Sequence, residues 1–279
     1  MKKIEQPIIA FPNGQTVCPL GQGTWKIGQS AARRDEEKQA LRHGIELGMN
    51  LVDTAEMYDN EELVGEVIRD CRKKVFLTSK VLPNNASYQG TKLACERSLR
   101  RLGTEYIDLY LLHWKGDHPY EETVRAMTEL QQEGKICMWG VSNLDVADMD
   151  RIISLPGGNG CTTDQVLYNL DDRGVEFDLV PWRADHRMPI MAYSPIGEGR
   201  LLRHRTLAEI ARRHNASPAQ IALAWTMRKP GIIAIPKAGN IAHVEENFRS
   251  LSIKLTDEDL HDLDTAFPRP TRKIPLAGW

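Results

Sequence analysis

The chain has 279 residues, which is more than an ordinary single domain but close to the usual size of one (β/α)8 barrel, about 250 residues. Its 36 basic and 38 acidic side chains leave a net charge of -2, which gives no electrostatic reason to expect binding to nucleic acid or to an anionic membrane. The five cysteines are widely spaced without a Cys-x-x-Cys pair, which excludes the common zinc patterns, and no apolar run is long enough to cross a bilayer.

The first expected elements are two short extended segments, 8–11 and 16–20, joined by a tight turn at Asn13-Gly14. A Gly-Gln-Gly sequence follows, but Lys26 stands where a dinucleotide-binding glycine loop needs its third glycine, and no helix pattern begins there. We therefore reject a Rossmann fingerprint. A doubly wound open sheet would need that fingerprint or a domain break, and the sequence contains neither.

From residue 40 onward, helix and strand patterns alternate. An apolar helical stripe over 40–48 precedes the strand 50–53, and Asp59-Asn60-Glu61-Glu62 has the form of a capping box before the next helix. The later strands are expected at 74–80, 107–112, 136–141, 161–166, 189–193 and 232–236. The later helices are expected near 95–102, 121–133, 174–186 with a break at Pro181, 207–214 and 217–228, and a short helix is expected to begin at Leu144-Asp145.

With the segment ending near Trp25 as the first strand, the chain has eight strand and helix units at roughly the spacing of a βαβ repeat, about 30 residues. This count predicts a (β/α)8 TIM barrel that forms one domain, residues 1–279. The predicted barrel has an N-terminal β-hairpin and extra helices near the C-terminus.

An active site in such a barrel lies at the C-terminal ends of the strands. Tyr58 is expected in the loop after the second strand. The polar or aromatic residues that end the predicted strands are Trp25, Asp53, Lys80, His113, Ser142, Asn143, Gln165, Tyr193 and Lys237.

Taken alone, Asp53 and Tyr58 are better explained as a turn cap and a half-buried aromatic ring than as parts of a site. Lys80 changes this interpretation, because a cation beside a phenol lowers the pKa of the phenol. A histidine such as His113 can in addition orient the oxygen of the phenol. An anion alone would raise that pKa, so the expected work of Asp53 is to hold Lys80 in place. These groups would form a proton donor for a carbonyl oxygen.

A proton donor reduces nothing without a hydride, so this chemistry implies a nicotinamide cofactor. Hydroxyl and carboxamide groups from Ser142, Asn143 and Gln165 suit the amide of a nicotinamide. The rival chemistry is a barrel aldolase in which Lys80 forms a Schiff base.

Several separated motifs resemble the aldo-keto reductase family, in the family's order and over nearly the whole chain. The motifs are Gly-Gln-Gly-Thr-Trp at 21–25, Asp-Thr-Ala-Glu-Met-Tyr at 53–58, Ser79-Lys80, Leu-Leu-His-Trp at 111–114, Trp-Gly-Val-Ser-Asn at 139–143, Gln165, Ala-Tyr-Ser-Pro at 192–195 and Ile-Pro-Lys at 235–237. The resemblance implies a catalytic tetrad in which Tyr58 donates the proton, His113 assists, and Lys80 paired with Asp53 sets the pKa of the phenol.

The resemblance also implies which residues contact the cofactor. Tyr193 would stack under the nicotinamide ring, Ser142, Asn143 and Gln165 would bind its carboxamide, and Ser194 and Ile196 would lie along the pyrophosphate. The remaining expected contacts are Gly23, Thr24, Trp25 and Asp53, and at the adenosine end Lys237, Ala238, His243, Glu246 and Asn247.

Two residues at the adenosine end depart from the pattern of NADP-preferring relatives, which usually have serine where Ala238 stands and arginine where His243 stands. Both departures weaken a grip on the 2'-phosphate, whereas Lys237 remains as a cation for it. We expect NADPH to be used, with NADH possible as well.

The expected partner is a small carbonyl substrate, reduced by a cytoplasmic monomer that holds no metal. Trp25, Tyr58, His113 and Trp114 are expected to wall the substrate pocket. The tail 267–279 is expected to form only a modest flap over an open pocket. The resemblance favours bacterial members that reduce methylglyoxal and other short aldehydes, and a non-catalytic NADP-binding barrel is the further alternative.

Overall fold

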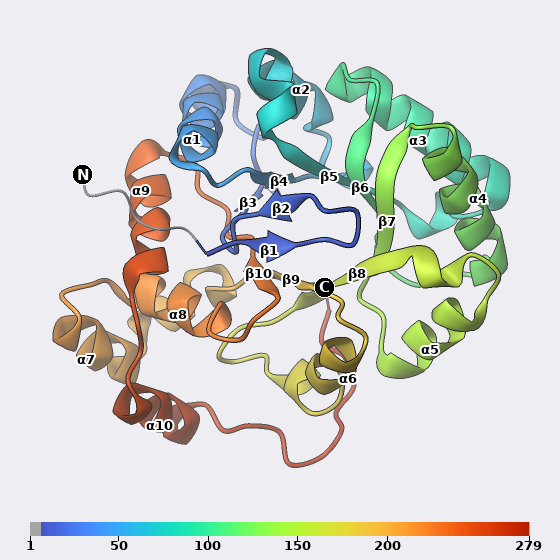
Figure 1. Cartoon of the computed structure of the whole chain (residues 1–279). Coiled ribbons are helices and arrows are strands. Elements are labelled where there is room, and N and C mark those ends of the chain that lie inside the picture. The colour runs from blue at the N-terminus through green and yellow to red at the C-terminus, as the bar shows by residue number, and fades with distance from the viewer. Residues whose placement is uncertain (1–6, 279) are drawn as a thin grey trace.

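The computed structural model describes residues 7–278. Residues 1–6 and Trp279 lie outside the described residues. Both belong to the predicted domain 1–279, and Trp279 also ends the predicted tail. The described chain begins with a hairpin whose strands β1 (Ile9–Ala10) and β2 (Thr16–Val17) pair antiparallel around a turn in which Gly14 has a φ of 85°. The hairpin crosses the centre of the molecule in Figure 1, as the Asn-Gly pair predicts.

The other strands form one parallel sheet, which runs in chain order from β3 to β10. Parallel bonding between Leu20 and Ala234 joins its first and last strands, and Gly23 N donates to Pro236 O at 3.0 Å. The sheet is therefore closed, which confirms the predicted (β/α)8 barrel with an N-terminal hairpin. The strands are β3 (Gln22–Gly23), β4 (Leu51–Asp53), β5 (Phe76–Val81), β6 (Ile107–Leu112), β7 (Ile136–Ser142), β8 (Cys161–Leu167), β9 (Ile190–Tyr193) and β10 (Ile232–Ala234).

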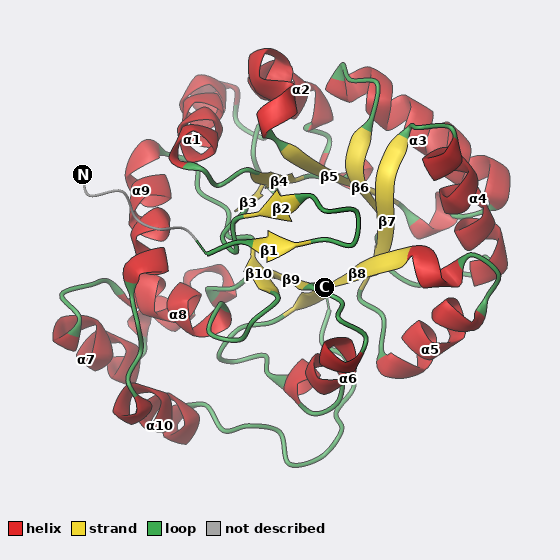
Figure 2. Cartoon of the chain, in the orientation of Figure 1, coloured by secondary structure: helices red, strands yellow, loops and turns green. Residues whose placement is uncertain are grey.

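Helices surround these strands in a ring (Figure 2). One α-helix follows each strand from β3 to β8, whereas two follow β9 and two follow β10, which are the extra helices expected near the C-terminus. The helices are α1 (Arg34–Leu47), α2 (Glu61–Ile68), α3 (Tyr88–Leu102), α4 (Tyr120–Gln132), α5 (Val146–Ser154), α6 (Leu179–Asp185), α7 (Arg205–Arg213), α8 (Pro218–Thr226), α9 (Ile241–Arg249) and α10 (Asp257–Ala266).

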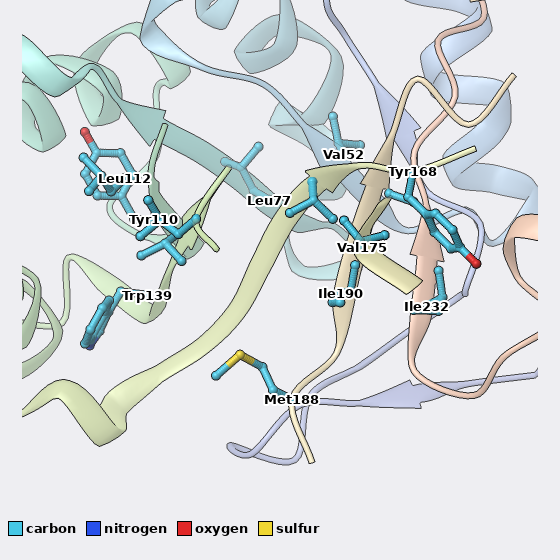
Figure 3. Packing of buried hydrophobic residues seen from close by; sticks show 14 of the residues in the cluster. Val52, Leu77, Tyr110, Leu112, Trp139, Tyr168, Val175, Met188, Ile190 and Ile232 are labelled. Carbon is cyan, nitrogen blue, oxygen red and sulfur yellow. The ribbon is translucent and has the colours of Figure 1, made fainter. Parts of the chain in front are cut away.

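Apolar side chains fill the barrel on both faces of the sheet. Between the sheet and the helices, the buried layer includes Val52, Leu77 and Ile190, which Figure 3 shows among their neighbours. Inside the barrel, Phe11 of the hairpin stacks on Phe76 with ring centroids 4.8 Å apart. Because Phe76 begins its strand, the hairpin plugs the N-terminal end of the barrel and leaves the C-terminal end for a site.

The predicted capping box at 59–62 is wrong, although a helix does begin there. Asp59 has a φ of 54°, and the N-cap residue Asn60 makes no capping bond with its side chain. Instead the Asn60 amide donates to Thr24 O at 2.7 Å and to Ile27 O at 3.1 Å. The side chain therefore fastens the loop after β3, a long-range use that local spacing cannot reveal.

The predicted break at Pro181 is also misplaced. Residues 174–176 form a separate short 3-10 helix, and α6 begins at Leu179, so that Pro181 lies in its first turn. A proline there lacks an N–H that would have no intrahelical partner in any case, so the helix continues through it. Along the part of the chain from 7 to 278, no helix is both long and apolar enough to cross a membrane.

Candidate active site

A cavity of about 470 Å³ opens at the C-terminal ends of the strands, the end opposite the hairpin. Thirteen of the residues expected at the site line it. They are Gly23, Trp25, Asp53, Tyr58, His113, Trp114, Ser142, Asn143, Gln165, Tyr193, Ser194, Ile196 and Lys237. Strand ends separated by more than two hundred residues in the sequence, such as Gly23 and Lys237, thus meet around one space, as the barrel topology requires.

Lys80 lies behind the cavity wall and is fully buried. Its Nζ donates to Asp53 Oδ2 at 2.7 Å, to Thr54 O at 2.8 Å and to Tyr58 Oη at 3.3 Å. The second oxygen of Asp53 accepts from Gln165 Nε2 at 2.7 Å. Burial acts to lower the pKa of Lys80, but Asp53 and Tyr58 together raise it above its ordinary value, so the ammonium stays charged.

The expectation that Lys80 lowers the pKa of Tyr58 below its ordinary value is wrong. Burial raises the pKa of this phenol above its ordinary value, and the neighbouring Lys80 opposes that rise only in part. Tyr58 therefore keeps its proton at neutral pH. Lys80 acts after the proton has left, because its positive charge stabilises the phenolate that remains.

His113 lies beside this pair. Its ring meets that of Tyr58 edge to face, with centroids 5.7 Å apart, and also lies 4.7 Å from the ring of Trp114. Burial, assisted by the charge of Lys80, lowers the pKa of His113 to about 2, so the imidazole is neutral. Its Nδ1 is buried without a partner among residues 7–278. We therefore expect the neutral ring to carry its proton on Nε2, where it can donate to an acceptor in the cavity.

The residues expected to bind a carboxamide form a connected network. Asn143 donates to His113 O at 3.2 Å and accepts from Tyr193 Oη at 2.9 Å, while Ser142 Oγ donates to Gln165 O at 2.8 Å. Asn143 has a φ of 59°, a left-handed conformation that asparagine tolerates better than most residues. Its oxygen and that of Gln165 keep lone pairs that no donor in the described chain uses, which suits the NH2 of a nicotinamide amide.

Several expected cofactor residues do not line the cavity. Thr24 is fully buried, and its hydroxyl has no partner in the described part of the chain. Ala238 packs into an apolar cluster with Leu20 and Phe248. The other three, His243, Glu246 and Asn247, all lie on α9, beyond the cavity end marked by Lys237.

The structure adds residues that sequence reasoning missed. The cavity wall also contains Lys26, Met57, Pro195, Glu198, Gly199, Ile235 and Pro236. Lys26 and Glu198 form an ion pair of 3.4 Å that joins the loops after β3 and β9. Both have a positive φ, and the Gly197-Glu198-Gly199 sequence was the available signal that this loop adopts a special conformation.

The C-terminal tail reaches further than the modest flap expected. Lys273 fastens it through ion pairs with Asp145 at 2.8 Å and with Asp178 at 2.9 Å. A Cβ atom on Gly278 would lie 3.8 Å from Asn143 Oδ1 and 4.0 Å from Tyr193 Oη. The expectation of an open pocket is therefore wrong on this side, because the tail runs up to the cavity.

Comparison with known proteins finds relatives over nearly the whole chain. Residues 19–267 match the model of the aldo/keto reductase family. Methylglyoxal reductase YeaE of Escherichia coli is 51% identical, and the match covers 98% of this chain and 99% of that protein. A crystal structure of an aldo/keto reductase from Klebsiella pneumoniae in complex with NADP and acetate is 46% identical with a TM-score of 0.95, over 98% of this chain and 99% of that one. Another structure from that organism, in complex with NADPH, is 46% identical with a TM-score of 0.96, over 99% and 100% of the two chains.

Proposed function

The chain belongs to the aldo/keto reductase family, and we propose that it reduces aldehydes and ketones to alcohols with NADPH. The observation that carries this proposal is the contact of 3.3 Å between the buried Lys80 ammonium and the Tyr58 phenol at the wall of the cavity. Short 2-oxoaldehydes such as methylglyoxal are the favoured substrates, on the likeness to the Escherichia coli reductase, and aromatic aldehydes suit the aromatic walls.

The residues of the chain perform the proton half of the reaction. When bound, the reduced nicotinamide supplies a hydride to the carbonyl carbon. Tyr58 gives the proton of its Oη to the carbonyl oxygen, which completes the alcohol and leaves a phenolate. Lys80 stabilises that phenolate, and neutral His113 orients the carbonyl oxygen with Nε2–H.

Asp53 acts through Lys80, since it keeps the ammonium charged and in place. Ser142, Asn143 and Gln165 would hold the nicotinamide amide, with Tyr193 as the surface under the ring. Trp25 and Trp114 would wall the substrate side. We also propose that residues 1–279 form a single domain that works as a monomer in the cytoplasm, in keeping with five cysteines that form no disulfide.

The alternatives suit these contacts less well. A Schiff-base aldolase needs a neutral, nucleophilic amine, whereas Lys80 donates to three oxygens and stays charged. A non-catalytic barrel has no use for a buried ion pair aimed at a phenol on the cavity wall. We therefore favour the reductase.

The test compares methylglyoxal, an aromatic aldehyde and a keto sugar with purified protein and NADPH. Tyr58→Phe should lower kcat by at least about 100-fold while NADPH still binds. Tyr106→Phe is the matched control, because this ring lies over Arg72 and lines no part of the cavity. Unchanged turnover in Tyr58→Phe would refute the mechanism. Cofactor-free cleavage trapped on Lys80 by borohydride would favour the aldolase.

A further inference from the structure

Two cations and one buried carboxylate surround the backbone of Gly239, just beyond the last strand. A Cβ atom at Gly239 would lie 2.8 Å from Arg33 Nη2, 3.0 Å from Lys237 Nζ and 3.3 Å from Glu37 Oε1. Glycine leaves room for this close approach, because a side chain would displace the ends of Arg33 and Lys237. Arg33 is the N-cap residue directly before α1, some two hundred residues away in the chain, and Figure 1 shows α1 beside α9.

Glu37 is the fixed point of this cluster, which we call the Gly239 cluster (Arg33, Glu37, Lys237 and Gly239). Its carboxylate is 3% exposed, and Oε2 accepts from Gly28 N at 2.8 Å. Its other oxygen lies 3.7 Å from Lys237 Nζ and 4.0 Å from Arg33 Nη2. Burial and the backbone bond hold this carboxylate still, so the two cations are drawn to one place.

The four cluster residues carry two positive charges and one negative charge, and Glu36, which is 54% exposed, also pairs with Arg33 Nε at 3.6 Å. Both cations can still reach a ligand. The side chain of Arg33 is 49% exposed and that of Lys237 is 34% exposed. Lys237 lines the cavity, so the two cations lie at the end of the cavity between β10 and α9. Such a pair of cations suits a phosphate, which a guanidinium binds with two donors.

This arrangement bears on the two residues that depart from the NADP pattern. The methyl group of Ala238 packs inside an apolar cluster and offers no hydroxyl to a phosphate. His243 lies in the first turn of α9, where its backbone N–H donates to Asn240 Oδ1 at 2.8 Å. A histidine is a poor substitute for the permanent, bidentate charge of an arginine. Selectivity for a 2'-phosphate would therefore need another cation.

We propose that Arg33 is this cation, and that Arg33 and Lys237 together bind the 2'-phosphate of NADP. Glu37 acts as a positioning residue that holds both cations beside Gly239. The proposal rests on the proposed function, since it concerns the cofactor of the same site. It predicts that the chain prefers NADP to NAD despite Ala238 and His243, because Arg33, the N-cap residue of α1, replaces the arginine that is missing at position 243.

The test measures cofactor binding by calorimetry, without turnover. Arg33→Gln should weaken the binding of NADP+ by about tenfold or more, as the loss of a charge-assisted contact does, and leave the binding of NAD+ within about twofold. Arg33→Lys should restore part of the lost affinity. The matched control is Arg34→Gln, because the next residue pairs with Glu66 on α2 and lies outside the cluster.

Unchanged binding of NADP+ in Arg33→Gln would overturn the proposal, and so would an equal loss for NADP+ and NAD+. The readout also separates this proposal from the proposed function. Suppose that Arg33→Gln selectively weakens NADP+ binding and that the unmodified protein reduces no carbonyl. This outcome would support the phosphate site and contradict the proposed reductase function. Normal carbonyl reduction by Arg33→Gln, with an unchanged preference for NADPH, would support the reductase function and contradict the phosphate site.

Discussion

Lys80 donates a hydrogen bond of 2.7 Å to Asp53 from the neighbouring strand, and both side chains are buried. A lone ammonium in this interior would lose its proton, since burial disfavours the charged form. The carboxylate prevents this, and so maintains a positive charge within reach of a phenol that lines the cavity. The ion pair is thus the structural condition for the proposed chemistry.

Lys80→Met should therefore damage both stability and turnover. Breaking a buried ion pair leaves Asp53 uncompensated, which typically costs about 3–5 kcal/mol. The loss of phenolate stabilisation should lower kcat by at least about 100-fold. Urea unfolding and steady-state kinetics measure the two effects, with Lys92→Met as a control at a more exposed ion pair.

The double variant Asp53→Asn/Lys80→Met separates these effects, because it removes both charges. It should recover much of the free energy of unfolding and none of the turnover. Recovery of turnover together with stability would mean that Lys80 is only structural.

Neutral His113 has a consequence for the pH dependence of stability. Burial lowers its pKa from 6.5 to about 2, so between these values the unfolded chain binds a proton that the folded chain does not. Stability should fall as the pH drops below 6.5, by up to about 1.4 kcal/mol per pH unit from this residue, and the contribution should be absent above 6.5. His113→Gln should show a shallower slope in urea unfolding between pH 6.5 and 4.5. An NMR titration of His113 with a midpoint near 6.5 would contradict this account.

The ion pair between Lys26 and Glu198 should slow the release of the cofactor. It joins two loops that line the cavity, and its side chains are 50% and 33% exposed. Because exposed pairs contribute about 0.2–1 kcal/mol, Glu198→Gln should speed NADP+ dissociation by up to about fivefold, and high salt should erase the difference. Stopped-flow tryptophan fluorescence measures the rate, with Glu209→Gln as a control at a surface pair on α7. Equal rates at low salt would show that the pair does not restrain the loops.

The sequence predicted those features that depend on local patterns and on barrel topology. The strand ending at Asp53 and the one leading to Lys80 were recognisable from apolar runs. Parallel pairing of these two strands brings their ends together independently of the loops. The same argument predicted that Gln165 and Tyr193 would face the cavity.

The remainder depended on contacts that no local pattern encodes. Asn60 resembles part of a capping box, yet its amide fastens a loop from another unit of the barrel. Arg33 belongs to no site motif, and only the packing of α1 against α9 brings it to Gly239. The direction of the pKa shift of Tyr58 depends on how burial compares with the charge of Lys80, and burial is a property of the whole fold.

The tail should limit the size of the substrate. Lys273 fastens it to Asp145 and Asp178, and Gly278 lies near the cavity residues Asn143 and Tyr193. Lys273→Ala removes both ion pairs, so the tail should leave the cavity more often and larger aldehydes should gain access. The ratio of kcat/KM for a bulky aromatic aldehyde to that for methylglyoxal should rise by up to about fivefold, given the modest energy of exposed pairs. Lys254→Ala, at the opposite end of the barrel, is the control. If the ratio is unchanged both in Lys273→Ala and in a chain shortened before Lys273, the tail does not restrict the pocket and the walls of the barrel alone set the substrate range.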